Sequence, residues 1–166
     1  MHVFWRTPVL AALTVSIVLI GGVDVVAQDA EKRITPSEVQ WPSGRSSLVG
    51  TSLVTGIESV ILHGDPSEAG PYTMLLRLPP NMRIDAHSHP DDRIATVISG
   101  TWFFGYGKEF DEALLKELPA GSVYTEPPGS DHFAMTRGEG VVVQISGVWP
   151  SGTTYVDSTN DPTRPE

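Results

Sequence analysis

The sequence of 166 residues contains no cysteine. No disulfide bond can form, so the stability of the folded chain must come from packing and from any metal ion that it binds. A cysteine nucleophile is excluded as well, and neither a serine-nucleophile arrangement nor a phosphate-binding loop is visible in the sequence. The chemistry of this chain must therefore be sought among other residue types.

Basic residues are also scarce. The sequence has 11 lysine and arginine residues against 20 aspartate and glutamate residues, which gives a formal net charge of −9. A chain with this excess of negative charge is repelled by nucleic acid and by anionic lipid. We therefore expect no nucleic-acid partner and, once any N-terminal leader is removed, no membrane partner.

Long apolar runs are absent except at the N-terminus. The basic residue Arg6 precedes an apolar run over residues 8–20, and the residues at 25–27 are typical of a cleavage site. We predict that residues 1–27 are a signal peptide and that the protein is periplasmic or secreted. The alternative is a retained membrane anchor, but glycine and aspartate interrupt the run at 21–24, where a membrane span should be most apolar.

The remainder of the chain predicts one all-β domain. Residues 28–47, with several proline, glycine and serine residues, are expected to form an extended N-terminal arm. From 48 to 157, short runs of β-forming residues alternate with turn signals, a pattern typical of a barrel or sandwich. Residues 158–166 are expected to be a flexible tail. The expected strands cover residues 57–62, 71–78, 94–98, 101–106, 121–125, 132–136, 141–148 and 153–156.

Two further predictions depend on local spacing. The strands over 94–98 and 101–106 flank a tight-turn signal at Ser99 and Gly100, so we expect them to form a hairpin. Between residues 109 and 118, apolar residues such as Phe110, Leu114 and Leu118 have helical spacing. This spacing predicts one short surface helix.

Three histidines form the most informative pattern in the chain. His87 and His89 are two residues apart, and side chains at this spacing on a β-strand point to the same face. His132 follows a proline–glycine turn at 127–129 and can complete the set from a distant strand. Neutral imidazole binds Zn, Fe, Cu, Ni or Mn in preference to Ca or Mg, which predicts one divalent transition-metal ion. The alternative is that the three histidines are hydrogen-bonded polar residues at the mouth of a barrel.

The residues around these histidines resemble the two sequence motifs of the cupin superfamily, G-x5-H-x-H-x3,4-E-x6-G and G-x5-P-x-G-x2-H-x3-N. The resemblance covers about residues 56–156 and implies a single cupin-type double-stranded β-helix, or jelly-roll barrel, here with one short surface helix. The chain resembles small exported single-domain bacterial cupins of unassigned activity. Because single-domain cupins often pair subunits through such an N-terminal arm, a homodimer is one option. The matching positions are His87, His89, Gly100, Gly121, Pro127, Gly129 and His132.

The chain departs from these motifs at three positions. Asn81 stands where the first glycine would be, Arg93 stands where the family's glutamate ligand would be, and Thr136 replaces the final asparagine. An arginine side chain has only donors, so Arg93 cannot be a metal ligand. The histidines would then form a site with open coordination positions, which resembles the three-histidine iron sites of some cupin dioxygenases.

Two arrangements are open for Arg93. Its guanidinium group can stay in the pocket, where a substrate carboxylate or phosphate would bridge it and the metal ion. It can instead turn away and form a salt bridge with Asp91, Asp92 or Glu126. Glu126 lies close to the second motif and is the best candidate for a general base. Arg93 and Glu126 are therefore the candidate catalytic residues beside the histidines.

Three functions are compatible with this pattern. The first is a small metalloenzyme, dioxygenase-like or using other metal-assisted chemistry, that acts on a small anionic substrate. The second is a non-catalytic cupin that binds a metal ion or a small molecule. The third is a barrel whose site has decayed and which serves only in assembly. The fold does not choose among them, because the reaction depends on the site.

Overall fold

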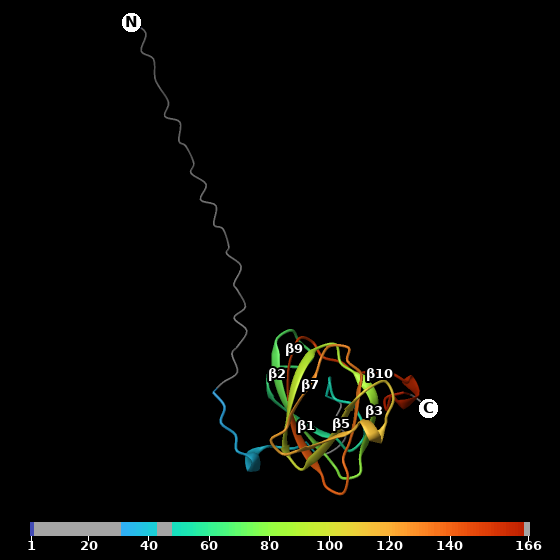
Figure 1. Cartoon of the computed structure of the whole chain (residues 1–166). Helices are drawn as coiled ribbons and strands as arrows, with labels where there is room; N and C mark the ends of the chain where they lie inside the picture. The colour runs from blue at the N-terminus through green and yellow to red at the C-terminus, as the bar shows by residue number, and fades with distance from the viewer. Residues whose placement is uncertain (2–30, 43–47, 165–166) are drawn as a thin grey trace.

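Two antiparallel sheets of five strands each together form a barrel (Figure 1). The computed structural model describes residue 1, residues 31–42 and residues 48–164. The architecture confirms the predicted all-β jelly roll. The first sheet has the order β1-β2-β9-β4-β7, with β1 at Glu58–His63, β2 at Pro71–Leu78, β9 at Val141–Val148, β4 at Asp92–Ser99 and β7 at Val123–Glu126. The second has the order β10-β3-β8-β5-β6, with β10 at Thr154–Tyr155, β3 at Arg83–Ser88, β8 at His132–Met135, β5 at Thr101–Tyr106 and β6 at Lys116–Pro119.

The core lies between the sheets, and the sequence of β2 shows how a strand contributes to it. Tyr72, Met74, Leu76 and Leu78 share one face of the strand because side chains alternate with a period of two residues. All four are buried, as the sequence pattern predicts. The same strand pairs along its whole length with β9, which in turn pairs with β4. β9 therefore lies at the centre of the first sheet and fixes the position of β4.

The hairpin predicted for residues 94–98 and 101–106 is wrong, although both strands exist. β4 pairs with β7 and β9 in the first sheet, whereas β5 pairs with β6 and β8 in the second. Gly100, between them, has a φ of 75°, and a β-carbon there would lie 2.3 Å from the carbonyl oxygen of Gly140. The turn signal therefore marks the point where the chain passes from one sheet to the other.

In place of the predicted surface helix over residues 109–118, the structure has one 3-10 turn followed by a strand. The turn, η2, covers Glu112–Leu114, and β6 begins at Lys116. The helical spacing of the apolar residues has a different cause, because Phe110 packs against the ring of Phe133 while Leu118 is buried in β6. Phe110 and Leu118 therefore have helical spacing in the sequence although they do not lie on one face of a helix.

Two of the departures from the motifs stabilise the turn that joins β2 to β3. Asn81 has a φ of 58°, in the left-handed region that asparagine tolerates better than most residues, and its backbone N–H donates to the carbonyl of Arg137 at 2.8 Å. The hydroxyl of Thr136 donates to the carbonyl of Pro79 at 2.6 Å and accepts from the N–H of Met82 at 2.9 Å. Both substitutions are therefore compatible with the fold.

The described part of the predicted N-terminal arm, residues 31–42, contacts the first sheet. The amino group of Lys32 donates to the carbonyl of Leu62 in β1 at 2.8 Å. The guanidinium carbon of Arg77 in β2 lies 4.4 Å from the ring centroid of Trp41. This segment thus lies against β1 and β2.

The remaining described elements are short. The 3-10 turn η1 covers Pro36–Glu38, and η3 covers Ser158–Asn160 within the segment predicted as a tail, which lies near β10 (Figure 1). The predicted signal peptide, residues 1–27, lies outside the described residues except for Met1. In the described ranges, no helix is long and apolar enough to cross a membrane.

Candidate metal centre

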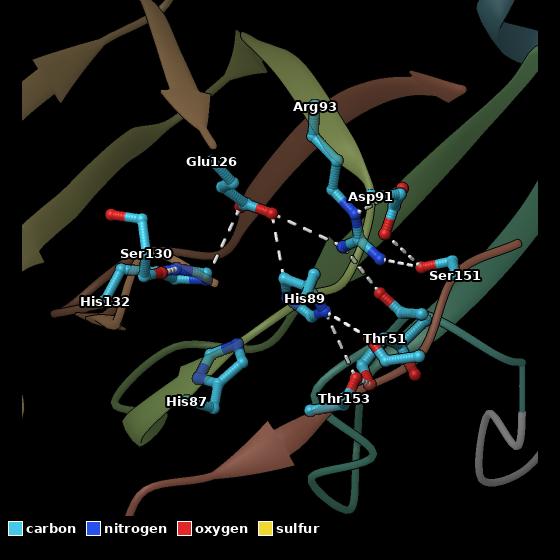
Figure 2. Close-up of polar contacts among 12 residues, drawn as sticks. Thr51, His87, His89, Asp91, Arg93, Glu126, Ser130, His132, Ser151 and Thr153 are labelled. Atoms are coloured by element: carbon cyan, nitrogen blue, oxygen red, sulfur yellow. Dashed lines mark hydrogen bonds and ion pairs between the residues drawn. The ribbon is translucent and has the colours of Figure 1, made fainter. Parts of the chain in front are cut away.

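The barrel brings the three predicted histidines together. His87 lies in β3, His89 follows that strand, and His132 is the first residue of β8. β3 and β8 are neighbours, and His87 is the direct partner of His132 in their register. All three side chains are buried, and Figure 2 shows their rings converging on one region of the interior. The spacing argument for a common face is confirmed.

Each histidine ring is held by a hydrogen bond from its Nδ1 atom to a backbone carbonyl. Because a carbonyl oxygen only accepts, each Nδ1 must carry the hydrogen, and each Nε2 is left free to act as a ligand. Anchoring of this kind is typical of metal-ligating histidines. The bonds are His87 to Asp85 at 2.8 Å, His89 to Gly152 at 2.6 Å and His132 to Ser130 at 2.9 Å.

The histidines fit a metal ion. One ring nitrogen from each lies within 4.8 Å of those of the other two. Two ligands at about 2.1 Å from one ion are about 3.4 Å apart in tetrahedral geometry, so ring nitrogens that are up to 4.8 Å apart would move closer by roughly 1 Å on binding the ion. The Nε2 atom of His132 is buried and has no hydrogen-bond partner among the described residues. A buried polar atom without a partner is costly, and a metal ion would satisfy it.

Burial keeps the rings of His87 and His89 neutral, which is the form that binds metal. Burial lowers the pKa of His87 from 6.5 to about 3, and the positive charges of a protonated His132 and of Arg93 act in the same direction. Burial, followed by the charge of Arg93, also lowers the pKa of His89 well below its usual value. At neutral pH, therefore, His87 and His89 need lose no proton to bind an ion.

Arg93 forms the salt bridge of its second predicted arrangement, but it does not turn away from the pocket, because it pairs with Asp91 and Glu126 while it lines the cavity. Its Nε atom donates to Asp91 at 3.0 Å, and Nη1 donates to the carbonyl of Gly50 at 2.8 Å and to Glu126 at 3.3 Å. Nη2 donates to the hydroxyl of Ser151. The side chain is only 2% exposed, and every guanidinium nitrogen has a partner (Figure 2). Asp92, the third suggested partner, is exposed.

Asp91 anchors this arginine and is itself surrounded by donors. Tyr72 donates its hydroxyl to Oδ2, and Ser151 donates to Oδ1 at 2.7 Å. Burial alone would raise the pKa of Asp91, but the charge of Arg93 and the hydrogen bonds from Tyr72, Arg93 and Ser151 outweigh it and lower the pKa. The carboxylate is therefore ionised at neutral pH and compensates the buried cation.

Glu126 lies between the histidines and Arg93. It is the last residue of β7 and the direct cross-strand partner of Arg93 in β4. Its Oε2 atom is 3.6 Å from Nε2 of His89, and its Oε1 atom is 3.9 Å from Nε2 of His132. The five predicted site residues therefore form one cluster (Figure 2).

Sequence reasoning missed the segment that closes the cluster near the end of the chain. Ser151 binds Asp91 and Arg93, Gly152 accepts from His89, and the Thr153 hydroxyl lies 3.3 Å from Nδ1 of His89. No motif marks these residues, because their contacts join positions about sixty residues apart in the chain.

The free volume beside the histidines is small and mostly apolar. It measures about 30 Å³, which is room for roughly two water molecules. The polar end consists of the histidines, Arg93 and Glu126. The apolar walls include Leu76, Leu78, Phe104, Tyr124, Val143 and Ile145.

Comparison with solved structures identifies the architecture. An RmlC-like cupin from Shewanella frigidimarina is similar, with a TM-score of 0.51 and 16% identity over 73% of this chain and 92% of that chain. The chain has the cupin fold. Two enzymes with 16% identity are also similar. They are the polyketide cyclase RemF from Streptomyces resistomycificus, with a TM-score of 0.62 over 80% of this chain and 90% of that chain, and a sugar phosphate isomerase of the cupin superfamily from Silicibacter pomeroyi, with a TM-score of 0.55 over 75% and 81%.

These likenesses establish the cupin fold and not a reaction, because the similar structures include both a cyclase and an isomerase. No protein-family profile matches the sequence, and no curated protein sequence matches it either. The function must therefore be argued from the cluster itself.

Proposed function

We propose that this cupin holds one divalent transition-metal ion on His87, His89 and His132 and uses it in chemistry on a small substrate. The observation that carries the proposal is the set of three buried imidazoles, each anchored through Nδ1, with the Nε2 atom of His132 left without a partner among the described residues. Imidazole ligands are compatible with Fe, Mn, Zn, Cu or Ni.

Each part of the cluster has a distinct task in this proposal. When bound, the metal supplies Lewis-acid or oxygen chemistry at the polar end of the cavity. The apolar walls, including Phe104 and Tyr124, exclude water and so strengthen electrostatic interactions at the site. The ring of Phe104 stacks on His132 at 5.3 Å between centroids and restricts its rotation.

We propose a small oxygen-containing substrate, anionic as in the expectation from the sequence. Because Arg93 has a partner for each of its nitrogens, an anion would be held by the metal ion and not by a free guanidinium group. Arg93 then acts as a positioning residue for Glu126. The cavity of about 30 Å³ limits the part of the substrate that can enter without movement of the walls.

The same small volume favours a second candidate function, a cupin that binds metal without catalysis. A site with room for roughly two waters can complete the coordination of an ion but hold little else. Incubation of metal-loaded protein with a panel of small carboxylic and hydroxy acids, followed by mass spectrometry, separates the two functions. Product that is absent with metal-free protein supports the enzyme, whereas saturable binding without product supports the binding function.

Elemental analysis tests the metal itself. The protein is purified without an affinity tag or chelator, beside His132→Ala and the control His63→Ala, which changes an exposed histidine at the end of β1. We expect about one equivalent of a transition metal in the wild type and the control, and almost none in His132→Ala. Equal metal in all three proteins, or none in any of them after reconstitution, would contradict the proposal.

Export to the periplasm or the medium is part of the proposal and is supported by the leader-like pattern of residues 1–27. N-terminal sequencing of the exported protein should find a chain that begins at Gln28.

A homodimer joined through the N-terminal arm is also proposed. Light scattering of the mature protein beside a form that lacks residues 28–42 tests this assembly, and a monomer in both would exclude it.

A further inference from the structure

The strand pairing of β7 with β4 determines how the side chain of Glu126 reaches the histidines. β4 and β7 are antiparallel neighbours, and Arg93 and Glu126 are directly opposite each other in their register. Side chains of directly opposed residues lie on the same face of a sheet. Both point into the barrel, where Glu126 is 5% exposed and Arg93 is 2% exposed. The carboxylate therefore enters the histidine cluster from the strand beside the one that carries Arg93.

The atoms that face one another between Glu126 and the histidines are all acceptors. Since the Nδ1 atoms of His89 and His132 donate to carbonyls, the Nε2 atoms of the neutral rings, the form that binds metal, face the carboxyl group with lone pairs. The two separations, 3.6 Å and 3.9 Å, are longer than a hydrogen bond, so no shared proton explains the arrangement. Both are shorter than the span of about 4.2 Å that two ligands of one metal ion can have. A cation between these atoms would relieve the repulsion.

We propose that Glu126 is the fourth protein ligand of the metal centre, so that the site consists of three histidines and one carboxylate supplied from β7. This assignment rests on the proposed metal site and adds a ligand that the position of Arg93 cannot provide. A carboxylate oxygen is a ligand for the same transition metals that imidazole binds.

The charges of the cluster agree with this role. Asp91 is paired with Arg93 at 3.0 Å, and these two side chains together carry no net charge. The carboxyl group of Glu126 lies outside this pair and beside the histidines, so as a ligand it would offset part of the charge of a divalent ion. The 3.3 Å contact from Nη1 of Arg93 to Oε2 holds this carboxylate in position.

Cobalt(II) titration tests the assignment, because the visible absorption of bound cobalt depends on the number and type of its ligands. The metal-free wild type is compared with Glu126→Gln and Glu126→Asp. The control is Glu112→Gln, which changes an exposed glutamate that also contacts an arginine, Arg137, at 3.4 Å. We expect both Glu126 variants to bind cobalt at least about 10-fold more weakly, with a changed absorption spectrum, and the control to match the wild type.

The outcomes separate this assignment from the metal site on which it rests. A Glu126→Gln protein with the affinity and spectrum of the wild type overturns the fourth ligand while the three-histidine site stands. Weaker binding with an unchanged spectrum also overturns it, because Glu126 would then only orient the histidines. Absence of cobalt binding by the wild type removes both proposals. Glu126→Asp keeps the charge near Arg93 and supplies the test if Glu126→Gln does not fold, as judged by circular dichroism.

Discussion

The hydroxyl group of Tyr72 in β2 donates a hydrogen bond to Oδ2 of Asp91, and both side chains are buried. The two residues belong to segments that are not paired as strands, because β9 lies between β2 and β4. Asp91 also accepts from Arg93 and Ser151. The tyrosine therefore supports, from the first sheet, the ion pair that holds Glu126 beside the histidines.

Replacement of Tyr72 by phenylalanine should destabilise the protein. The change removes one donor from a buried carboxylate, and a hydrogen bond to a charged group contributes about 1.5–3 kcal/mol. We expect the free energy of unfolding, measured by urea denaturation, to fall by this amount. The control is Tyr106→Phe, whose exposed hydroxyl donates to the carbonyl of Thr125 at 2.6 Å and should contribute less. Equal losses in the two variants would contradict the role given to Tyr72.

Gly147 should tolerate no side chain. A β-carbon there would lie 2.5 Å from the hydroxyl oxygen of Tyr72 and 2.7 Å from Oδ2 of Asp91. We expect Gly147→Ala to push this pair apart and to lower the free energy of unfolding by about 1–3 kcal/mol, as overpacking of a core does. Gly138→Ala is the matched control, since nothing lies within 4 Å of its β-carbon position. If Gly147→Ala and Gly138→Ala have the same free energy of unfolding, the short distance from position 147 to Tyr72 and Asp91 does not limit the side chain there.

Much of the fold could be predicted from the sequence, because the inward and outward faces of a strand are a local property. The bounds of β2, β5 and β9 agree with the predicted ranges 71–78, 101–106 and 141–148. The choice of partner strand is not local, which explains the wrong hairpin at Gly100. A period of two residues identifies β4 and β5 as strands but does not say that they belong to different sheets.

The candidate site could be predicted in part for the same reason. His87 and His89 share a face by their spacing, and the second motif places His132 beside them. The sequence could name Asp91, Asp92 and Glu126 as possible salt-bridge partners of Arg93. It could not choose among them, because all three are expected close to Arg93 in the fold. The anchors at Ser151 and Gly152 depend on how the end of the chain packs across the barrel, and no sequence pattern encodes that contact.

The metal-free protein should lose stability as the pH falls below neutral. The pKa of His87 in the folded protein is about 3, against 6.5 as its ordinary value, chiefly because of burial. Below its ordinary pKa, the unfolded chain binds a proton that folded His87 does not bind, so stability is lost between the ordinary and the folded pKa. His89 contributes in the same direction, since its pKa is also lowered.

Urea denaturation at several pH values between neutral and about 4 measures this slope. In His87→Asn, which has no group that titrates at this position, the free energy of unfolding should fall less steeply with decreasing pH. His63→Asn, which makes the same change at an exposed site outside the cluster, serves as the control. A His87→Asn protein with an unchanged slope would show that another group causes the acid sensitivity.

Metal removal should lower the melting temperature, because an ion that binds only the folded state stabilises it by mass action. At a free metal concentration about 100-fold above Kd, this stabilisation is about 2.7 kcal/mol. We expect differential scanning calorimetry to show a higher Tm for the metal-loaded wild type than for the chelator-treated protein, and no such difference for His87→Ala. His63→Ala should keep the full difference, since that histidine lies outside the cluster. If His87→Ala keeps it too, the stabilising ion binds elsewhere, and the histidine cluster is not the metal site.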